Sequence, residues 1–183
     1  MKKTTLLTLI LCVSLCHSNE NYNALFANSL NEMKKTDQEV RNSRPINMQD
    51  MKVIDRKNTN TLKLLINKYG WPTNDLVGED GVLAAFLIIQ HASHDLEFQM
   101  YGLKIFRKLS GSTEPMLHLL PYLEDRVLMR NELPQKYGTQ GQCIGGEFVL
   151  YQLENPILVD WYRINSRLSK LSEYLEAVKN NCH

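Results

Sequence analysis

The sequence predicts a mainly helical domain with one small β-hairpin near its C-terminal third. Apolar residues recur at helical spacing through most of the chain, whereas glycines cluster at positions 138, 141, 145 and 146. The extended-looking run Glu147-Phe-Val-Leu-Tyr-Gln follows these glycines, which favours two short strands around a turn. With 183 residues and 43% hydrophobic content, the chain is long enough to bury the core of one domain.

The first 18 residues are predicted to be a signal peptide. Lys2 and Lys3 precede an apolar run over residues 6–15, and small or polar residues follow near Ser18. The run is too short for a stable membrane span. We therefore expect a periplasmic or secreted protein without a transmembrane span. Cleavage after Ser18 is favoured, and a lipid anchor at Cys16, which would leave the protein attached to the envelope, is the alternative.

Charge and cysteine usage restrict the partners. The formal net charge of +1 becomes about −1 without Lys2 and Lys3, and no basic stripe remains for phosphate backbones. Nucleic acid is therefore not an expected partner. Cys143 and Cys182 remain after the leader, and they could form a disulfide in an exported protein or stay as two free thiols.

The N-terminal half begins with segments of different strength. Residues 19–46 have a weak helical spacing that ends near Pro45 and are expected to form an N-terminal arm. A single helical domain over 47–183 follows. Its first helix, 48–69, ends at Gly70 and Pro72, with residues 55–61 as an exposed middle or a break.

The later helices follow from apolar runs and caps. Residues 82–92 are apolar on all sides, which predicts a helix surrounded by protein, and a helix over 95–109 follows. The cap-like stretch 112–115 predicts another helix reaching about Met129, in which Pro121 either causes a kink or marks the true start. After the hairpin, the helical pattern returns from Asn155 and continues past Leu171.

His91 is the first candidate functional residue. On the predicted helix it shares a face with Leu87 and Ile88, so it should be buried or half-buried. Beside a carboxylate it would be an oriented general base, and otherwise a structural histidine bonded within the core. His94 and Glu97 spread over too wide an arc of the helix to share one ion with His91, and no metal or cofactor is expected.

Asp125 and Arg126 interrupt an apolar helix with adjacent opposite charges. They point about 100 degrees apart and therefore meet different neighbours. They could join a buried ion-pair network, or Asp125 could orient His91 while Arg126 binds an anionic group of a ligand. The chain has no Gly-x-Ser-x-Gly elbow, phosphate loop or dinucleotide fingerprint to suggest other chemistry.

Several short motifs together resemble an uncharacterised bacterial family with a domain of unknown function. These motifs are Gly70-Trp71-Pro72, Gln90-His91-Ala92, Gln99, Asp125-Arg126-Val127, Gln135-x-Tyr137-Gly138-Thr139-Gln140 and Asp160-x-x-Arg163. The match runs from about residue 55 to 175. The resemblance implies a mainly helical fold and a shared polar cluster, but no established reaction. The chain departs from the family pattern where Tyr162-Arg163 replaces a paired arginine.

The predicted site lies where the helix ending at His91, the Asp125-Arg126 helix and the segment 135–140 meet. Its predicted catalytic residues are His91 and Asp125, and its predicted ligand-binding residues are Trp71, Arg126, Gln135, Tyr137, Gln140 and Arg163. Hydrolysis or proton transfer with His91 as base is the most economical chemistry, and the ligand would be a small molecule. The alternative is a non-catalytic envelope binding or interaction module, with an envelope protein as partner and the same cluster as a structural device.

Overall fold

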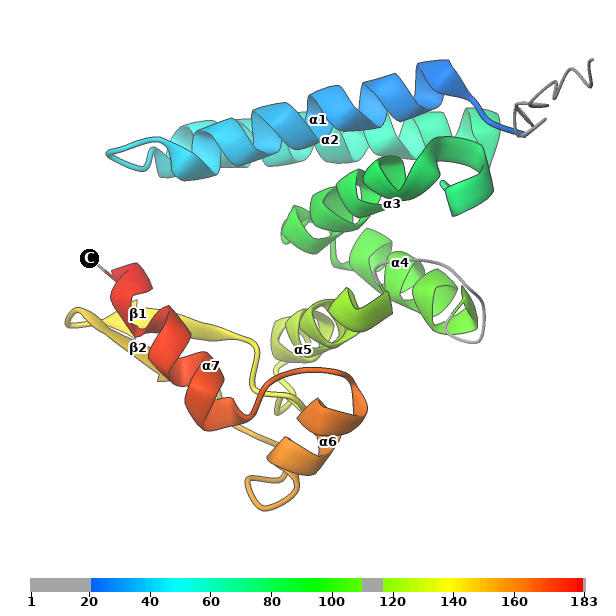
Figure 1. Ribbon diagram of the computed structural model, residues 1–183. Helices are drawn as coiled ribbons and strands as arrows, with labels where there is room; N and C mark the ends of the chain where they lie inside the picture. Colours follow the sequence, from blue (N-terminus) through cyan, green and yellow to red (C-terminus); the bar gives the residue numbers. More distant parts are fainter. Residues whose placement is uncertain (1–20, 110–116, 183) are drawn as a thin grey trace, which may run out of the picture.

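The computed structural model describes residues 21–109 and 117–182 (Figure 1). Their helices are α1 (Ala24–Asn42), α2 (Met48–Tyr69), α3 (Asn74–His91), α4 (Leu96–Leu109), η1 (Leu117–Leu119), α5 (Leu120–Arg130), α6 (Val159–Asn165), α7 (Leu171–Val178) and η2 (Lys179–Cys182). The strands β1 (Gly141–Ile144) and β2 (Glu147–Leu150) form one antiparallel hairpin. The predicted fold class, mainly helical with a hairpin in the C-terminal third, is confirmed.

Helices α1 and α2 form a long antiparallel pair that lies against α3 (Figure 1). Asn23 starts α1 by accepting a hydrogen bond from the Phe26 N–H, and Asn47 caps α2 in the same way. Phe26 and Leu30 are fully buried in the core. The predicted N-terminal arm therefore needs correction, because residues 24–42 form an integral core helix.

The polar stretch in the middle of α2 is neither exposed throughout nor a break. Helix α2 is continuous, and Asn58 and Thr59 are buried against α1. The Asn58 side chain donates a hydrogen bond to the Met33 carbonyl, 3.1 Å away. Asn58 therefore connects the two long helices, as expected for a buried polar group that needs a partner.

The apolar helix α3 occupies the middle of the molecule and contacts α1, α2, α4 and α5. The prediction that it is surrounded by protein is confirmed, since Ala84, Ile88 and Ile89 are almost fully buried. Helix α4 approaches closely at Gly102, where a Cβ would lie only 2.8 Å from Ile89 Cγ2. This packing holds the C-terminal end of α3, and therefore His91, in a rigid frame.

Pro121 lies in the first turn of α5, which begins at Leu120. Of the two alternatives left by the sequence, the start of the helix is the observed one. Proline has no N–H, and the first turn of a helix is where that donor would have no intrahelical partner. The predicted cap at 112–115 lies outside the described residues, as do the predicted signal peptide at 1–18 and Cys16.

The C-terminal part packs the hairpin against α7 and η2. Gly145 and Gly146 turn the hairpin with positive φ angles of 61° and 85°, which pairs Cys143 with Phe148 in the ladder. A disulfide joins Cys143 to Cys182, so the first of the two alternatives for these cysteines is the observed one. Within the described residues, no helix combines the length and the apolar character needed to cross a bilayer.

Candidate functional site

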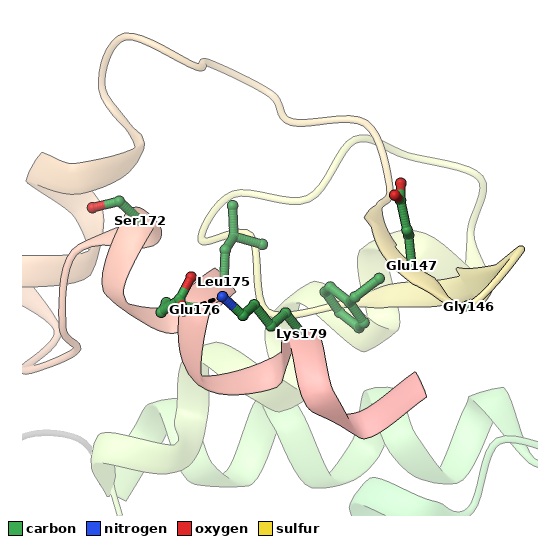
Figure 2. A pocket seen from close by; sticks show the side chains of 7 residues that line it. Gly146, Glu147, Ser172, Leu175, Glu176 and Lys179 are labelled. Atoms are coloured by element: carbon green, nitrogen blue, oxygen red, sulfur yellow. Dashed lines mark hydrogen bonds and ion pairs between the residues drawn. The ribbon is translucent and has the colours of Figure 1, made fainter. Parts of the chain in front are cut away.

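A pocket of about 650 Å³ lies between the hairpin turn and α7 (Figure 2). Its lining includes Phe148 and Leu175, and Lys179 forms an ion pair with Glu176. The lining residues include no histidine, and its cation is already paired. This pocket therefore offers little for proton-transfer chemistry.

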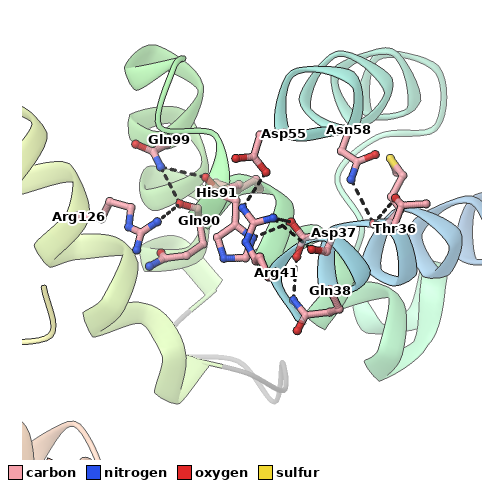
Figure 3. Close-up of polar contacts among 12 residues, drawn as sticks. Thr36, Asp37, Gln38, Arg41, Asp55, Asn58, Gln90, His91, Gln99 and Arg126 are labelled. Carbon is pink, nitrogen blue, oxygen red and sulfur yellow. Dashed lines mark hydrogen bonds and ion pairs between the residues drawn. The ribbon is translucent and has the colours of Figure 1, made fainter. Parts of the chain in front are cut away.

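His91 borders a second pocket, of about 310 Å³, which is lined by residues of α2 and by residues at and just after the C-terminal end of α3. The ring belongs to the last residue of α3, and its Nδ1 lies 2.8 Å from Oδ1 of Asp37 on α1 (Figure 3). The Asp37 side chain is 1% exposed, whereas that of His91 is 17% exposed. One ring nitrogen is thus held by a buried carboxylate while the residue itself faces a cavity.

The Asp37 carboxylate is held in place from several directions. Arg41 Nη1 lies 2.8 Å from the same Oδ1, and Gln38 donates a hydrogen bond of 2.8 Å to Oδ2. Arg41 also reaches Asp55 on α2, with 2.7 Å between Nη2 and Oδ1. An ionised Asp37 accepts the Nδ1–H of a neutral His91, which leaves the lone pair on Nε2.

Burial of the imidazole favours its neutral form at neutral pH. Burial lowers the pKa of His91 below its ordinary value of 6.5. The hydrogen bond and negative charge of Asp37 oppose this effect, while the positive charges of Arg41 and Arg126 add to it. A neutral imidazole with a carboxylate on Nδ1 is the form that can accept a proton at Nε2.

The rest of the pocket wall carries more positive than negative groups. Besides His91, it is lined by Lys52, Asp55, Arg56, Ser93 and His94. Asp55 is already paired with Arg41, so Lys52 and Arg56 are left as the charges at the opening. Such an opening favours ligands with negative or polar oxygen atoms.

Asp37, Asp55 and His91 also have a spacing that could suit a metal, because their ligand atoms lie within 4.8 Å of one another. Arg41 binds both carboxylates, so one guanidinium offsets one of their two negative charges. A metal ion would have to displace Arg41 from two ion pairs. The cluster is therefore an Asp–Asp–His–Arg set with a formal charge of −1, in which Arg41 already engages both carboxylates.

Asp125 does not orient His91, and this part of the predicted site needs correction. Its fully buried carboxylate accepts hydrogen bonds from the backbone N–H groups of Lys136, Tyr137 and Thr139, at 2.8 to 3.2 Å, and from the Thr139 hydroxyl at 2.9 Å. Burial raises the pKa of Asp125, and these hydrogen bonds oppose the rise. Asp125 therefore anchors the loop 135–140, while Asp37 is the carboxylate at His91.

Other predicted ligand-binding residues also hold the loop. Gln135 donates to the carbonyls of Gln140 and Tyr151 and accepts the Gln140 N–H. The fully buried Arg163 donates to the Tyr137 carbonyl at 2.7 Å and to the Ser169 carbonyl at 2.6 Å. These side-chain groups face inward, in agreement with the structural alternative for the cluster.

Tyr137 and Trp71 are packed aromatic residues. Tyr137 is 7% exposed and lies edge-on to Tyr162. Trp71 makes edge-to-face contacts with Tyr101 and Phe106 on α4, and its Nε1 has no partner in the part of the chain that the structure describes. Trp71 thus packs against α4 after the end of α2, and these contacts give it a structural role.

Gln140 and Arg126 connect the loop to the C-terminal end of α3. Arg126 Nε donates to Gln140 Oε1, and its Nη1 donates to the carbonyl of Gln90, the residue before His91, both at 3.0 Å. Figure 3 shows Gln90 between Arg126 and His91. Of the residues predicted to form the site, the structure brings Arg126 and Gln140 to the neighbourhood of His91.

Sequence reasoning missed Asp37, Arg41 and Asp55. A signal for Asp37 was present, because it continues the stripe of Phe26, Leu30 and Met33 at spacings of four, three and four residues. An acid at the next position of an apolar stripe faces the core and needs a buried partner. Asp55 lies on the half-exposed side of α2 and has no comparable signal.

The fold and the cluster together define a mainly helical protein with a buried Asp–His pair at the edge of a pocket. The chain belongs to the family of unknown function DUF6624, whose sequence it matches over residues 27–182. This match confirms the resemblance to a domain of unknown function and extends it into α1, which carries Asp37. Comparisons with curated proteins and with solved structures gave no match.

Proposed function

We propose that the protein is an exported bacterial hydrolase of small molecules in which His91 acts as the general base. The observation that carries this proposal is the contact of 2.8 Å between His91 Nδ1 and the buried Asp37, made by a ring that borders a pocket of about 310 Å³. The pair has the arrangement in which a carboxylate orients an imidazole and stabilises its protonated form.

In the proposed reaction, Nε2 of His91 takes a proton from a water molecule in the pocket. The water oxygen forms the new bond to the electrophilic centre of the substrate while the bond to the leaving group breaks. The imidazolium then returns the proton to the leaving group, which restores the neutral ring. Asp37 stays ionised throughout, because Arg41 and Gln38 stabilise its negative charge.

The proposed location is the periplasm or the outside of the cell. The basic and apolar start of the sequence supports it, as does the disulfide between Cys143 and Cys182, because such bonds persist in oxidising compartments. Attachment to the envelope through Cys16 remains the alternative to cleavage after Ser18.

The test compares His91→Gln and Asp37→Asn with wild-type protein on nitrophenyl esters and nitrophenyl phosphates. We expect turnover to fall by about 10²- to 10⁴-fold in the His91 variant, and less in the Asp37 variant, with melting temperatures close to wild type. His94→Gln is the matched control, since His94 lines the same pocket but is exposed. Full turnover by His91→Gln would exclude its role as base, and a collapse of its stability would make it structural.

A second candidate function, a non-catalytic envelope binding module, is favoured by an exposed apolar surface around α6. Ile157, Trp161 and Ile164 are 92%, 61% and 56% exposed, respectively. Exposed aromatic and aliphatic side chains at helical spacing are typical of binding surfaces. Retention of an envelope protein by the wild type but not by Trp161→Ser, together with absent turnover, would support this alternative.

A further inference from the structure

Arg126 is a half-buried cation without an acidic partner in residues 21–109 and 117–182. Its two hydrogen bonds go to neutral oxygens, the Gln140 side-chain Oε1 and the Gln90 carbonyl, each 3.0 Å away. Burial lowers the pKa of Arg126 to about 10, so the guanidinium still carries its charge at neutral pH. A desolvated charge of this kind is costly unless an anion compensates it.

The two other arginines with little exposure are satisfied in different ways. Arg41 binds the carboxylates of Asp37 and Asp55. Arg163 gives its Nε and Nη1 to backbone carbonyls and stacks its guanidinium on the Tyr174 ring, 4.8 Å from the centroid. Both arginines therefore have a clear structural role. Within the described residues, Arg126 alone of these three has neither an ion pair nor a contact with the face of an aromatic ring.

The unused donors of Arg126 form one edge of its guanidinium. A guanidinium has five N–H groups, of which Arg126 uses one on Nε and one on Nη1. The remaining three point from Nη1 and Nη2. Nη2 has no hydrogen bond to the described residues and is not among their fully buried, unpartnered polar atoms, so it is open to solvent. Such an edge fits two oxygens of a carboxylate or phosphate.

The surrounding side chains hold this edge in one orientation. Gln140, which receives the Nε donor, also donates to Thr139 Oγ1 at 3.1 Å and to the Tyr122 carbonyl at 3.3 Å. Gln90 donates to the same Tyr122 carbonyl, and its own buried Oε1 has no partner among the residues described. The hydrogen bonds of Gln140 therefore hold the Arg126 guanidinium in one orientation.

The Arg126 guanidinium lies at the C-terminal end of α3, next to His91. Arg126 Nη1 contacts the carbonyl of the residue that precedes His91, and Figure 3 shows the two side chains flanking Gln90. The positive charge of Arg126 lowers the pKa of His91, and Arg41 and Asp55 in turn act on the pKa of Arg126. An anion bound to Arg126 would therefore lie within electrostatic reach of the proposed base.

We propose that Arg126 receives an oxyanionic group of the ligand, either a carboxylate or a phosphate, and that Gln140 acts as the positioning residue for Arg126. The anion subsite stands on the geometry of the Gln90–Arg126–Gln140 cluster. Its role in placing a substrate against His91 rests on the proposed function. The ligands of this protein are then small molecules that carry a negatively charged oxygen acid.

The experiment measures binding of inorganic phosphate and of acetate to the full chain by calorimetry and by the shift in melting temperature, with sodium chloride balancing the ionic strength. We expect saturable binding of at least one anion to wild type, and the anion that binds identifies the group. Arg126→Gln should weaken it about 10- to 100-fold, since charge-assisted hydrogen bonds are lost. Arg130→Gln, one turn further on the same helix and exposed, should leave it unchanged.

Two further variants test the shape of the Arg126 guanidinium and the positioning role of Gln140. Arg126→Lys retains the charge but loses the planar fork, so it should weaken binding about tenfold even if Arg126→Gln does not fold. Gln140→Ala should also weaken binding, and a neutral amide such as acetamide should not compete. Equal binding by Arg126→Lys and wild type, or no binding of either anion to wild type beyond the chloride control, would overturn the proposal.

The same assay separates this subsite from the proposed base. His91→Gln should bind the anion normally, because its ring donates nothing to the Arg126 edge. Normal anion binding together with full turnover in His91→Gln would reject the hydrolase mechanism and leave the subsite in place. Lost anion binding in Arg126→Gln together with lost turnover in His91→Gln would support both.

Discussion

The loop 135–140 depends on Asp125, and replacing this residue by alanine should destabilise the fold strongly. The carboxylate receives four donors, three backbone N–H groups and the Thr139 hydroxyl, and it is fully buried. At a net value of about 1 kcal/mol per hydrogen bond, Asp125→Ala should lower the free energy of unfolding by about 4 kcal/mol. Asp125→Asn keeps the shape and one acceptor oxygen, so about 2 kcal/mol is expected.

The assay is urea unfolding at neutral pH with the disulfide intact, followed by circular dichroism and extrapolated linearly to water. Asp160→Ala is the matched control, because the half-buried Asp160 accepts a single hydrogen bond from the Leu171 N–H at 2.7 Å and should cost about 1 kcal/mol. If Asp125→Ala costs no more than Asp160→Ala at an unchanged m value, the loop does not depend on the Asp125 carboxylate.

Three further perturbations test other parts of the structure. Replacing Cys143 and Cys182 by serine removes a disulfide that joins residues with a sequence separation of 39. The free energy of unfolding, measured by urea unfolding, should fall by up to about 4 kcal/mol. An unchanged value would show that the disulfide does not stabilise the fold. Because the folded-state pKa of His91 is lowered, its contribution to stability is present above its ordinary pKa of 6.5 and is lost as the pH falls through the folded-state value. The melting temperature of wild type should therefore decrease over this range more than that of His91→Gln, and parallel curves would contradict the lowered pKa. Gly138→Ala should cost about 1 to 3 kcal/mol, because φ is +68° and the new Cβ would lie 2.9 Å from Leu171 Cδ1, and a neutral effect in thermal melts would refute this close packing.

The sequence predicts helices well where the apolar pattern is dense. Residues 82–89 are apolar at every position, so a buried helix is the only economical solution, and the structure has it. The pattern of α1 is diluted by lysine, glutamate and asparagine, so the segment resembled an arm although Phe26 and Leu30 are fully buried. Tertiary contacts with α2 and α3 supply what the local pattern lacks.

His91 could be predicted as a candidate site residue from the sequence, but the carboxylate that contacts it could not. His91 stands out because it ends an apolar helix, whereas its carboxylate lies 54 positions earlier in a separate helix. Nothing in a single sequence states which of two distant acids meets an imidazole. Asp125 could be recognised as buried, but its partners are backbone N–H groups, which every residue has, so no pattern of side chains marks them.

The disulfide also determines how the molecule responds to a protease. The bond between Cys143 and Cys182 closes a covalent ring that contains β2, α6 and α7. The exposed stretch at Pro156 and Ile157 lies inside this ring. A single cut there would leave both fragments attached to each other, and they would separate only after reduction. Without a reductant, a nicked molecule would therefore keep its C-terminal segment beside the hairpin.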